Sequence, residues 1–207
     1  MTVVADARRK EILAAAQACF ARAGFHQASM ADICAEAGLS PGSVYRYFRG
    51  KADIIAAMVD DCREKTHQWF AELAAAPDIV AGLGVIADHI LAELNDPVEQ
   101  VLYFESTAEA MRNPTVADAV RKQDAEAIEL LTAALVRGQS AGQVDATLDP
   151  TLTAHTLSAL VDGLTWRKFL DPAAHPPAYA ATLRTLLDRF LRPSVPLNPR
   201  RPKGDRR

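Results

Sequence analysis

The stretch from residue 24 to residue 51 constrains the fold of this chain more than any other. It reads GFHQASMADICAEAGLSPGSVYRYFRGK, two short helical segments around a tight turn. Ser29 can cap the first segment, and Asp32 completes a capping box with an aspartate in place of the usual glutamate. Gly38 ends this segment, because a sharp turn at that point needs a positive φ. Ser40 caps the second segment, which opens with a proline where no backbone donor is required.

The second segment, residues 41–47, has the features of a helix that enters a DNA groove. Gly42 and Ser43 keep its leading face small, and the guanidinium fork of Arg46 matches the edge of guanine. This layout is typical of a helix-turn-helix, whose second helix lies in the major groove. The predicted DNA contacts are Ser29, Ser40, Pro41, Gly42, Ser43, Tyr45, Arg46, Tyr47 and Lys51. Arg46 is assigned to a base, and the tyrosines, Lys51 and the two capping serines are assigned to phosphates, which fix register without reading sequence.

The same stretch resembles the tetracycline-repressor (TetR) family of bacterial regulators. The matching positions are Gly24-Phe25, Ala28-Ser29, Ile33-Cys34, Ala37-Gly38-Leu39-Ser40, Gly42, Ser43, Val44, Tyr45, Tyr47-Phe48 and Lys51. Ala28 departs from the family, which commonly has threonine there, and Cys34 replaces a packed alanine. The resemblance implies a sequence-specific transcriptional regulator, a repressor released by a small effector, that dimerises through its last two helices.

The rest of the chain is helical in its hydrophobic period, and no strand pattern stands out. Further helices are expected at about residues 6–23, 51–75, 77–94, 97–111, 114–142, 150–170 and 178–191. The predicted fold is therefore all-α with about nine helices. The expected units are a DNA-binding domain at 1–51, an effector-binding and dimerisation domain at 52–191, and a basic, proline-rich tail at 192–207.

The net charge of -3 conceals an uneven distribution along the chain. Residues 1–51 carry seven Lys and Arg against four acids, whereas residues 52–191 are acidic. DNA is attracted by the local positive potential of the basic N-terminal segment. A net charge close to zero for the whole chain therefore does not argue against DNA binding.

The cysteine and hydropathy patterns favour an intracellular protein without a metal. The three cysteines are odd in number and unclustered, and no Cys/His ligand spacing occurs, so we expect reduced thiols and neither a metal nor a cofactor. No apolar run approaches the length of a membrane span, and the start lacks a signal-peptide core. The expected location is the cytoplasm, with no membrane partner.

Two alternative classes of protein remain open on the sequence. Gly138, Ser140 and Gly142 match GxSxG, the nucleophile elbow of α/β-hydrolases, but that motif needs a strand before it, whereas here it closes an amphipathic helix. We therefore expect no enzyme, and we read Gly142 as a helix cap. The second alternative is an architectural DNA-binding or interaction module without an effector.

Polar and aromatic side chains on apolar helical faces indicate a small-molecule cavity within residues 52–191. Glu105 lies among valines and leucines, where an acid costs free energy unless it is paired or faces water or a ligand. Pairing with an arginine is the alternative. The candidate effector contacts are His67, Phe70, Tyr103, Glu105, Asp162 and Trp166. Since two of the six are acids, a ligand with a cationic or donor-rich end and an apolar body is favoured.

A homodimer is expected to form through the last two helices. Apolar residues form an edge on each of them, and Gly163 lets two helices approach closely. The predicted interface residues are Leu157, Leu160, Val161, Leu164, Leu183, Leu186, Leu187 and Phe190. The expected partners are therefore double-stranded operator DNA, a small effector and a second copy of the chain.

Overall fold

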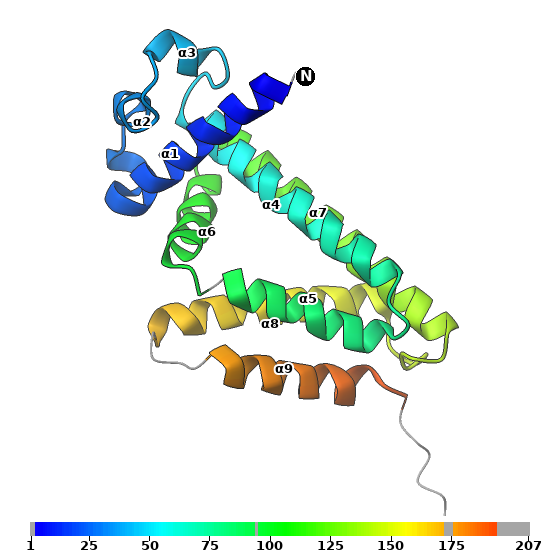
Figure 1. Ribbon diagram of the computed structural model, residues 1–207. Coiled ribbons are helices and arrows are strands. Elements are labelled where there is room, and N and C mark those ends of the chain that lie inside the picture. Colours follow the sequence, from blue (N-terminus) through cyan, green and yellow to red (C-terminus); the bar gives the residue numbers. More distant parts are fainter. Residues whose placement is uncertain (1–2, 94, 172–175, 194–207) are drawn as a thin grey trace, which may run out of the picture.

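The computed structural model describes residues 3–93, 95–171 and 176–193. Nine α-helices and no strands occupy these residues, which confirms the all-α prediction (Figure 1). The helices are α1 (Val3–Gln27), α2 (Met30–Glu36), α3 (Pro41–Tyr45), α4 (Lys51–Ala74), α5 (Ile79–Glu93), α6 (Pro97–Ala110), α7 (Pro114–Ser140), α8 (Pro150–Leu170) and α9 (Pro176–Leu191). The predicted linker after Asp171 and the predicted tail lie mostly outside the described residues.

Short-range signals set the ends of most helices. Helices α3, α6, α7 and α8 each begin with a proline that follows a capping side chain, which accepts a backbone N–H of the first turn. Gly24, with φ 74° and ψ 162°, interrupts α1 one residue after its expected end. Helix α3 is two residues shorter than predicted, since Arg46 already forms its C-cap.

Two clusters of buried apolar side chains hold the helices together. The first joins α1, α2, α3 and the start of α4, and it also contains Val116 from α7. The second joins α5, α8 and α9 to the far halves of α4 and α7. Helix α4 contributes Ile54 and Val59 to the first cluster and Leu73 to the second. The first cluster therefore crosses residue 51, and the proposed boundary there stays a prediction.

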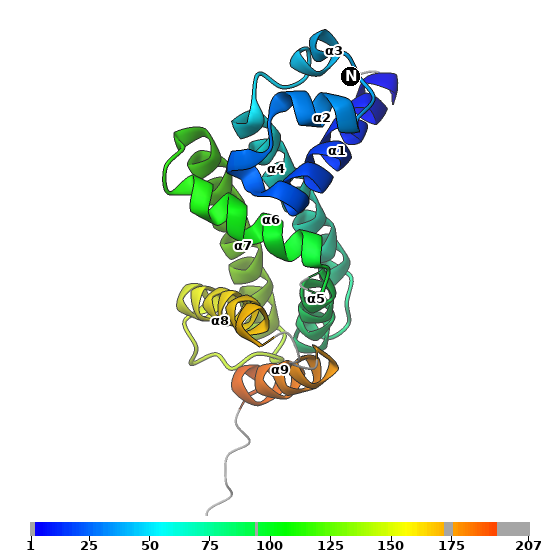
Figure 2. The same ribbon diagram turned by 90° about the vertical axis from the view of Figure 1, so that its left-hand side faces the viewer.

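Two long, adjacent helices, α4 and α7, form the centre of the molecule. Helices α4 and α7 run side by side, with the N-terminal helices α1–α3 at one end and α5, α8 and α9 at the other (Figures 1 and 2). Helix α6 lies between the two ends and packs against both α1 and α7. Helix α6 therefore contacts the N-terminal helices directly from beside the long helix α7.

The GxSxG motif does not have the geometry of a nucleophile elbow. Gly138 and Ser140 lie in the last turns of α7, so a helix precedes the serine where the elbow needs a strand. The Ser140 hydroxyl donates to the carbonyl oxygen of Val136 at 3.0 Å, within its own helix. Gly142 has φ 70° directly after the C-cap of α7, as its reading as a helix cap predicted.

Candidate DNA-binding surface and effector cavity

The predicted turn between the two short helices is present in detail. The Asp32 amide donates to Ser29 Oγ at 3.1 Å, and the Ser29 amide donates to Asp32 Oδ2 at 2.8 Å, which completes the capping box. Gly38 has φ 64°, and the Ser43 amide donates to Ser40 Oγ at 3.3 Å. Val44 is fully buried and anchors the back of α3 in the first cluster. The helix is thus held with its opposite face toward solvent.

Most of the predicted DNA contacts are exposed to solvent. Tyr45 is half exposed, Arg46 is exposed, and a side chain added at Gly42 would meet nothing within 4 Å. Tyr47 differs, since its ring packs partly against the first cluster. The exposed candidates are Ser29, Ser40, Pro41, Gly42, Tyr45 and Arg46, with Ser43 partly buried. Their contacts with DNA stay a prediction.

Lys51 has an intramolecular role that the sequence did not reveal. Its ammonium donates to the carbonyl oxygens of Phe25 at 2.6 Å and His26 at 3.2 Å, and it lies 4.6 Å from the centre of the Phe25 ring. These carbonyls belong to the short turn that follows the interruption of α1 at Gly24, so the ammonium ties this turn to the start of α4, and the ring adds a cation–π contact. The phosphate contact proposed for Lys51 stays a prediction, and the geometry gives the residue a structural role.

We expect Lys51→Met to lower the free energy of unfolding by about 1–2 kcal/mol, because charge-assisted hydrogen bonds and the ring contact are lost together. Thermal unfolding followed by circular dichroism measures the effect. Lys122→Met is the matched control, since Lys122 is exposed on α7. Equal melting temperatures for the two variants would show that Lys51 does not hold α1 against α4.

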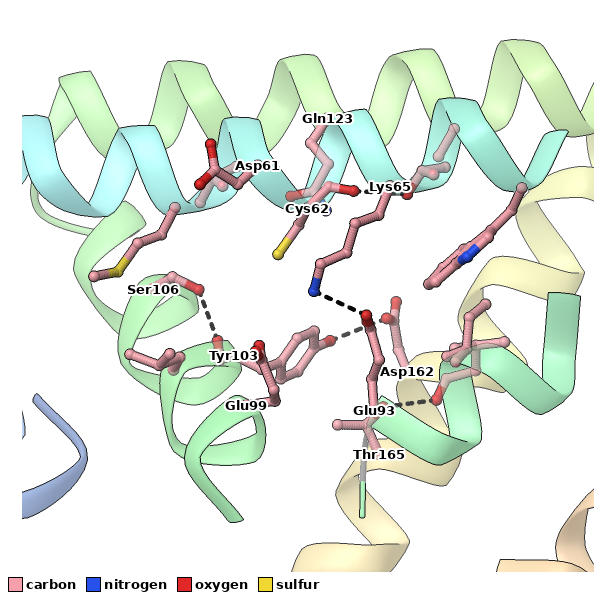
Figure 3. A pocket seen from close by; sticks show the side chains of 18 of the residues that line it. Asp61, Cys62, Lys65, Glu93, Glu99, Tyr103, Ser106, Gln123, Asp162 and Thr165 are labelled. Carbon is pink, nitrogen blue, oxygen red and sulfur yellow. Dashed lines mark hydrogen bonds and ion pairs between the residues drawn. The ribbon is translucent and has the colours of Figure 1, made fainter. Parts of the chain in front are cut away.

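A cavity of about 510 Å³ lies between α1 and the helices from α4 to α9 (Figure 3). Its volume falls within the ~300–1,000 Å³ typical of small-ligand sites. Apolar side chains form most of the wall. They include Leu13, Phe20, Ile55, Met58, Val59, Phe70, Leu83, Ile86, Leu102, Ile128, Leu157, Leu183 and Leu187.

Four of the six predicted effector contacts line this cavity, namely Phe70, Tyr103, Glu105 and Asp162. His67 and Trp166 are not part of this wall, so the structure does not bring them together with the other four. His67 Nε2 lies 2.7 Å from a carboxylate oxygen of Glu126 on α7. Trp166 is half exposed and packs against Phe104 and Phe169 outside the cavity.

Several polar groups of the cavity wall could not be predicted from the sequence. Lys65 Nζ donates to Glu93 Oε1 at 2.9 Å, joining α4 to α5, and Glu99 lies nearby at the start of α6 (Figure 3). Single charges on amphipathic helices usually face solvent, so their spacing gave no signal. Burial raises the pKa of the Cys62 thiol to about 11, which keeps it protonated near neutral pH and argues against a reactive thiolate.

Tyr103 and Asp162 form a polar pair across the cavity. The Tyr103 hydroxyl donates to Asp162 Oδ1 at 3.0 Å and links α6 to α8 (Figure 3). Burial, followed by the nearby Asp162 carboxylate, raises the pKa of the Tyr103 phenol. The phenol therefore remains a hydrogen-bond donor, and Asp162 keeps acceptor capacity for a second donor.

Glu105 connects the cavity to the DNA-binding helices. Its Oε2 accepts the backbone N–H of Phe25 at 2.9 Å, across a sequence separation of 80 residues. Both sequence-based alternatives, an arginine partner and a ligand, missed this contact. The Phe25 carbonyl accepts Lys51. The backbone of a single residue therefore joins α6, the end of α1 and the start of α4.

The predicted dimer interface needs correction, because several of its leucines are buried within the subunit. Leu157, Leu183 and Leu187 are 7%, 5% and 5% exposed and belong to the second cluster. Further along α8, Leu160 and Leu164 pack against that cluster and Val161 lines the cavity. Only Leu186 and Phe190 of the predicted set are exposed, at 39% and 42%.

The apolar face of α8 that is exposed to solvent differs from the one predicted as the dimer interface. It follows the helical period through Leu152, Ala159, Gly163, Trp166 and Leu170. A side chain added at Gly163 would meet nothing within 4 Å. Together with Leu186 and Phe190 of α9, these residues form what we call the free α8–α9 face.

Two further kinds of feature are absent from the described residues. No helix there has the length and hydropathy needed to cross a membrane. Nor does the described part of the chain bring three or more His, Cys, Asp or Glu side chains together in an arrangement that could hold a metal ion.

A helix-turn-helix unit with an exposed second helix, joined to an all-helical body, defines a DNA-binding transcriptional regulator. Residues 12–58 match the family described as bacterial regulatory proteins, tetR family. Residues 83–192 match the C-terminal region of BetI-type transcriptional repressors. The chain belongs to the TetR family of regulators, which confirms the resemblance carried by residues 24–51.

Individual relatives agree with this assignment over nearly the full chain. The chain is 27% identical over 192 residues to the HTH-type transcriptional regulator UidR of Escherichia coli, covering 92% of this chain and 96% of that protein. It is 29% identical over 182 residues to the regulator TtgR of Pseudomonas putida, covering 81% and 83%. The solved structure of Salmonella enterica GusR superposes with a TM-score of 0.76 at 32% identity, covering 89% and 95%.

Proposed function

We propose that this regulator represses transcription by binding operator DNA as a two-fold dimer, and that a small molecule filling the cavity releases it. The contact between Glu105 and Phe25 carries the proposal, because it ties the cavity wall to the DNA-binding helices. An architectural module without an effector has no need of a cavity of this volume. A regulator of this kind acts where the chromosome is, so we place it in the cytoplasm.

The proposed dimer forms through the free α8–α9 face. Exposed apolar side chains on α8 and on α9 favour association with the same side chains of a second copy in a two-fold arrangement. Two copies of α3 would then read half-sites about one helical turn, ~34 Å, apart on one side of the DNA. Arg46 is the proposed base contact, and Tyr45, Ser29 and Ser40 are proposed to contact phosphates.

The proposed route from effector to DNA runs through α6. A ligand that contacts Tyr103 and displaces α6 also displaces Glu105, which holds the Phe25 amide. Phe25 is in turn bound by Lys51, so the end of α1 and the start of α4 shift together. By reciprocity, the effector must bind the DNA-bound dimer more weakly by the same factor as it weakens DNA binding.

At saturating effector, Glu105→Leu should reduce several-fold the factor by which the effector weakens DNA binding, because the hydrogen bond that transmits the shift is removed. The measurement compares operator affinity with and without any compound that raises the melting temperature of the protein. Ser106→Ala is the matched control, since that hydroxyl also faces the cavity but bonds only to the Tyr103 carbonyl of its own helix. If the effector lowered the operator affinity of Glu105→Leu as strongly as that of the unchanged protein, the coupling between cavity and DNA-binding helices would not run through Glu105.

The function itself can be tested by footprinting on the DNA that flanks the protein's own gene. The footprint is repeated with each compound that a thermal-shift screen shows to bind. Repression released by an effector predicts a protected, two-fold symmetric site that at least one binding compound exposes. Protection that every binding compound leaves unchanged would favour the architectural alternative.

A further inference from the structure

The charged groups of the cavity wall are not balanced. The wall contains five acids and two lysines: Asp61, Glu93, Glu99, Glu105, Asp162, Lys10 and Lys65. Asp61 is neutralised by Arg9 at 2.9 Å. Glu93 is neutralised by Lys65, also at 2.9 Å. The other acids have no such cation among the described residues.

Three carboxyl groups therefore border the cavity without an ion-pair partner in the described part of the chain. Glu105 accepts the Phe25 amide, and Asp162 accepts the Tyr103 hydroxyl. Glu99 accepts no hydrogen bond from any described residue, and burial raises the pKa of its carboxyl group. A carboxylate that loses water without gaining donors is destabilised, so the partly buried Glu99 would gain from a donor or a cation, and Asp162 has acceptor capacity left for one.

The remainder of the cavity is apolar. Leu83 and Ile86 of α5 and Leu183 and Leu187 of α9 are buried and face the space from the opposite side to α6. The polar groups lie closer to solvent, since Tyr103 is 36% exposed and Asp162 is exposed. A molecule that fits both parts has an apolar body directed inward and a polar end directed toward α6 and α8.

We propose that the cavity takes a small molecule with a positively charged, hydrogen-bond-donating end, placed between Glu99 and Asp162, and an apolar body. This inference rests on the proposed effector function and specifies its ligand. The site is the cavity as a whole, and the unpaired acids determine which end of a ligand it accepts. Glu99 and Asp162 border the same space as Lys65 and Tyr103 (Figure 3).

An anionic ligand fits these charges poorly. It could bond to a free donor of the Lys65 ammonium, but it would then lie close to the Glu93 carboxylate that holds this ammonium as well as to the unpaired acids. Lys10 does not change this balance, because it is exposed on α1 while the unpaired acids belong to α6 and α8. At equal apolar burial, electrostatics therefore favours the cation.

Three probes that share one alkyl chain separate charge from apolar burial: octylammonium, octanol and octanoate. Calorimetric titration of the full chain should give the highest affinity for octylammonium, an intermediate one for octanol, and one at least about tenfold lower for octanoate. Glu99→Gln should weaken octylammonium binding by about five- to tenfold and strengthen octanoate binding, because a negative charge beside the ligand is removed.

Matched variants distinguish the cavity from the surface. Glu64→Gln makes the same charge change on an exposed part of α4 outside the cavity, and it should leave the order of the probes unchanged. Ser106→Trp and Ala127→Trp narrow the cavity from α6 and α7, and either should abolish binding of all three probes. Circular dichroism identifies which of these two variants is folded, and the folded one is used.

The outcomes separate the two proposals. Octanoate binding as tightly as octylammonium, or an unchanged preference in Glu99→Gln, would overturn the charge assignment and leave the effector function standing. If the probes still bind to a folded cavity-narrowing variant, the ligand does not bind in the cavity. That result would overturn both the charge assignment and the proposed effector function. The predicted order of affinities, lost on narrowing, supports both.

Discussion

Gly163→Glu should convert the protein to monomers and lower its affinity for operator DNA by at least about a hundredfold. Gly163 lies on the free α8–α9 face with nothing within 4 Å of an added side chain, so the subunit itself should fold. Glutamate is also a better helix former than glycine. Between two copies, however, the added carboxylates would be buried next to each other, which is strongly unfavourable.

The loss of DNA affinity follows from losing the second half-site. A dimer binds the second half-site at a high effective concentration, and a monomer does not. Sedimentation gives the mass and a gel shift gives the affinity. Ala125→Glu adds the same charge on the exposed side of α7 and should leave both unchanged. A Gly163→Glu protein that sediments as a dimer would place the interface on another surface.

Arg46→Ala should weaken operator binding by about 1–3 kcal/mol, or roughly five- to 150-fold, and relax the preference at one base of each half-site. Arg46 is exposed at the end of α3, beyond the fully buried Val44 that fixes this helix in the first cluster. Its fork can bond both acceptors of a guanine edge.

Binding to random DNA provides the contrast for Arg46. Arg49→Ala removes a neighbouring exposed charge and should weaken binding to operator and random DNA alike, with a shallower salt dependence. Affinities for both DNA types, measured at several salt concentrations, distinguish the two arginines. Equal losses on operator and random DNA for Arg46→Ala would contradict its role in reading a base.

The features that the sequence predicted well all depend on neighbours within a few residues. The capping box at Ser29, the turn at Gly38 and the cap at Ser40 use partners three or four positions away, and all appear in the structure. The helix starts at prolines were also predicted correctly, because each depends on a proline and the capping residue directly before it. Since each signal is local, spacing alone was enough to place it.

The features that the sequence missed depend on which helix faces which. Helix α8 is apolar on more than one side, so spacing could not show that Leu157 points into the subunit while Trp166 points out. The Phe25–Glu105 contact joins residues that only the packing of α6 against α1 brings together. A charged residue such as Lys65 or Lys51 likewise reveals its partner only when the distant helix is in place.

Helix α4 can act as a lever. It is one uninterrupted helix of 24 residues that is anchored in the second cluster at one end and begins at Lys51, directly after the helix-turn-helix, at the other. Its length is ~36 Å at ~1.5 Å per residue, so a tilt of about 5° about the far end moves its start by ~3 Å. That displacement is close to the ~3.4 Å rise of one base pair. In a dimer, the two tilts add, so a change in the cavity that tilts each α4 by only a few degrees can displace the two copies of α3 from their half-sites on the DNA.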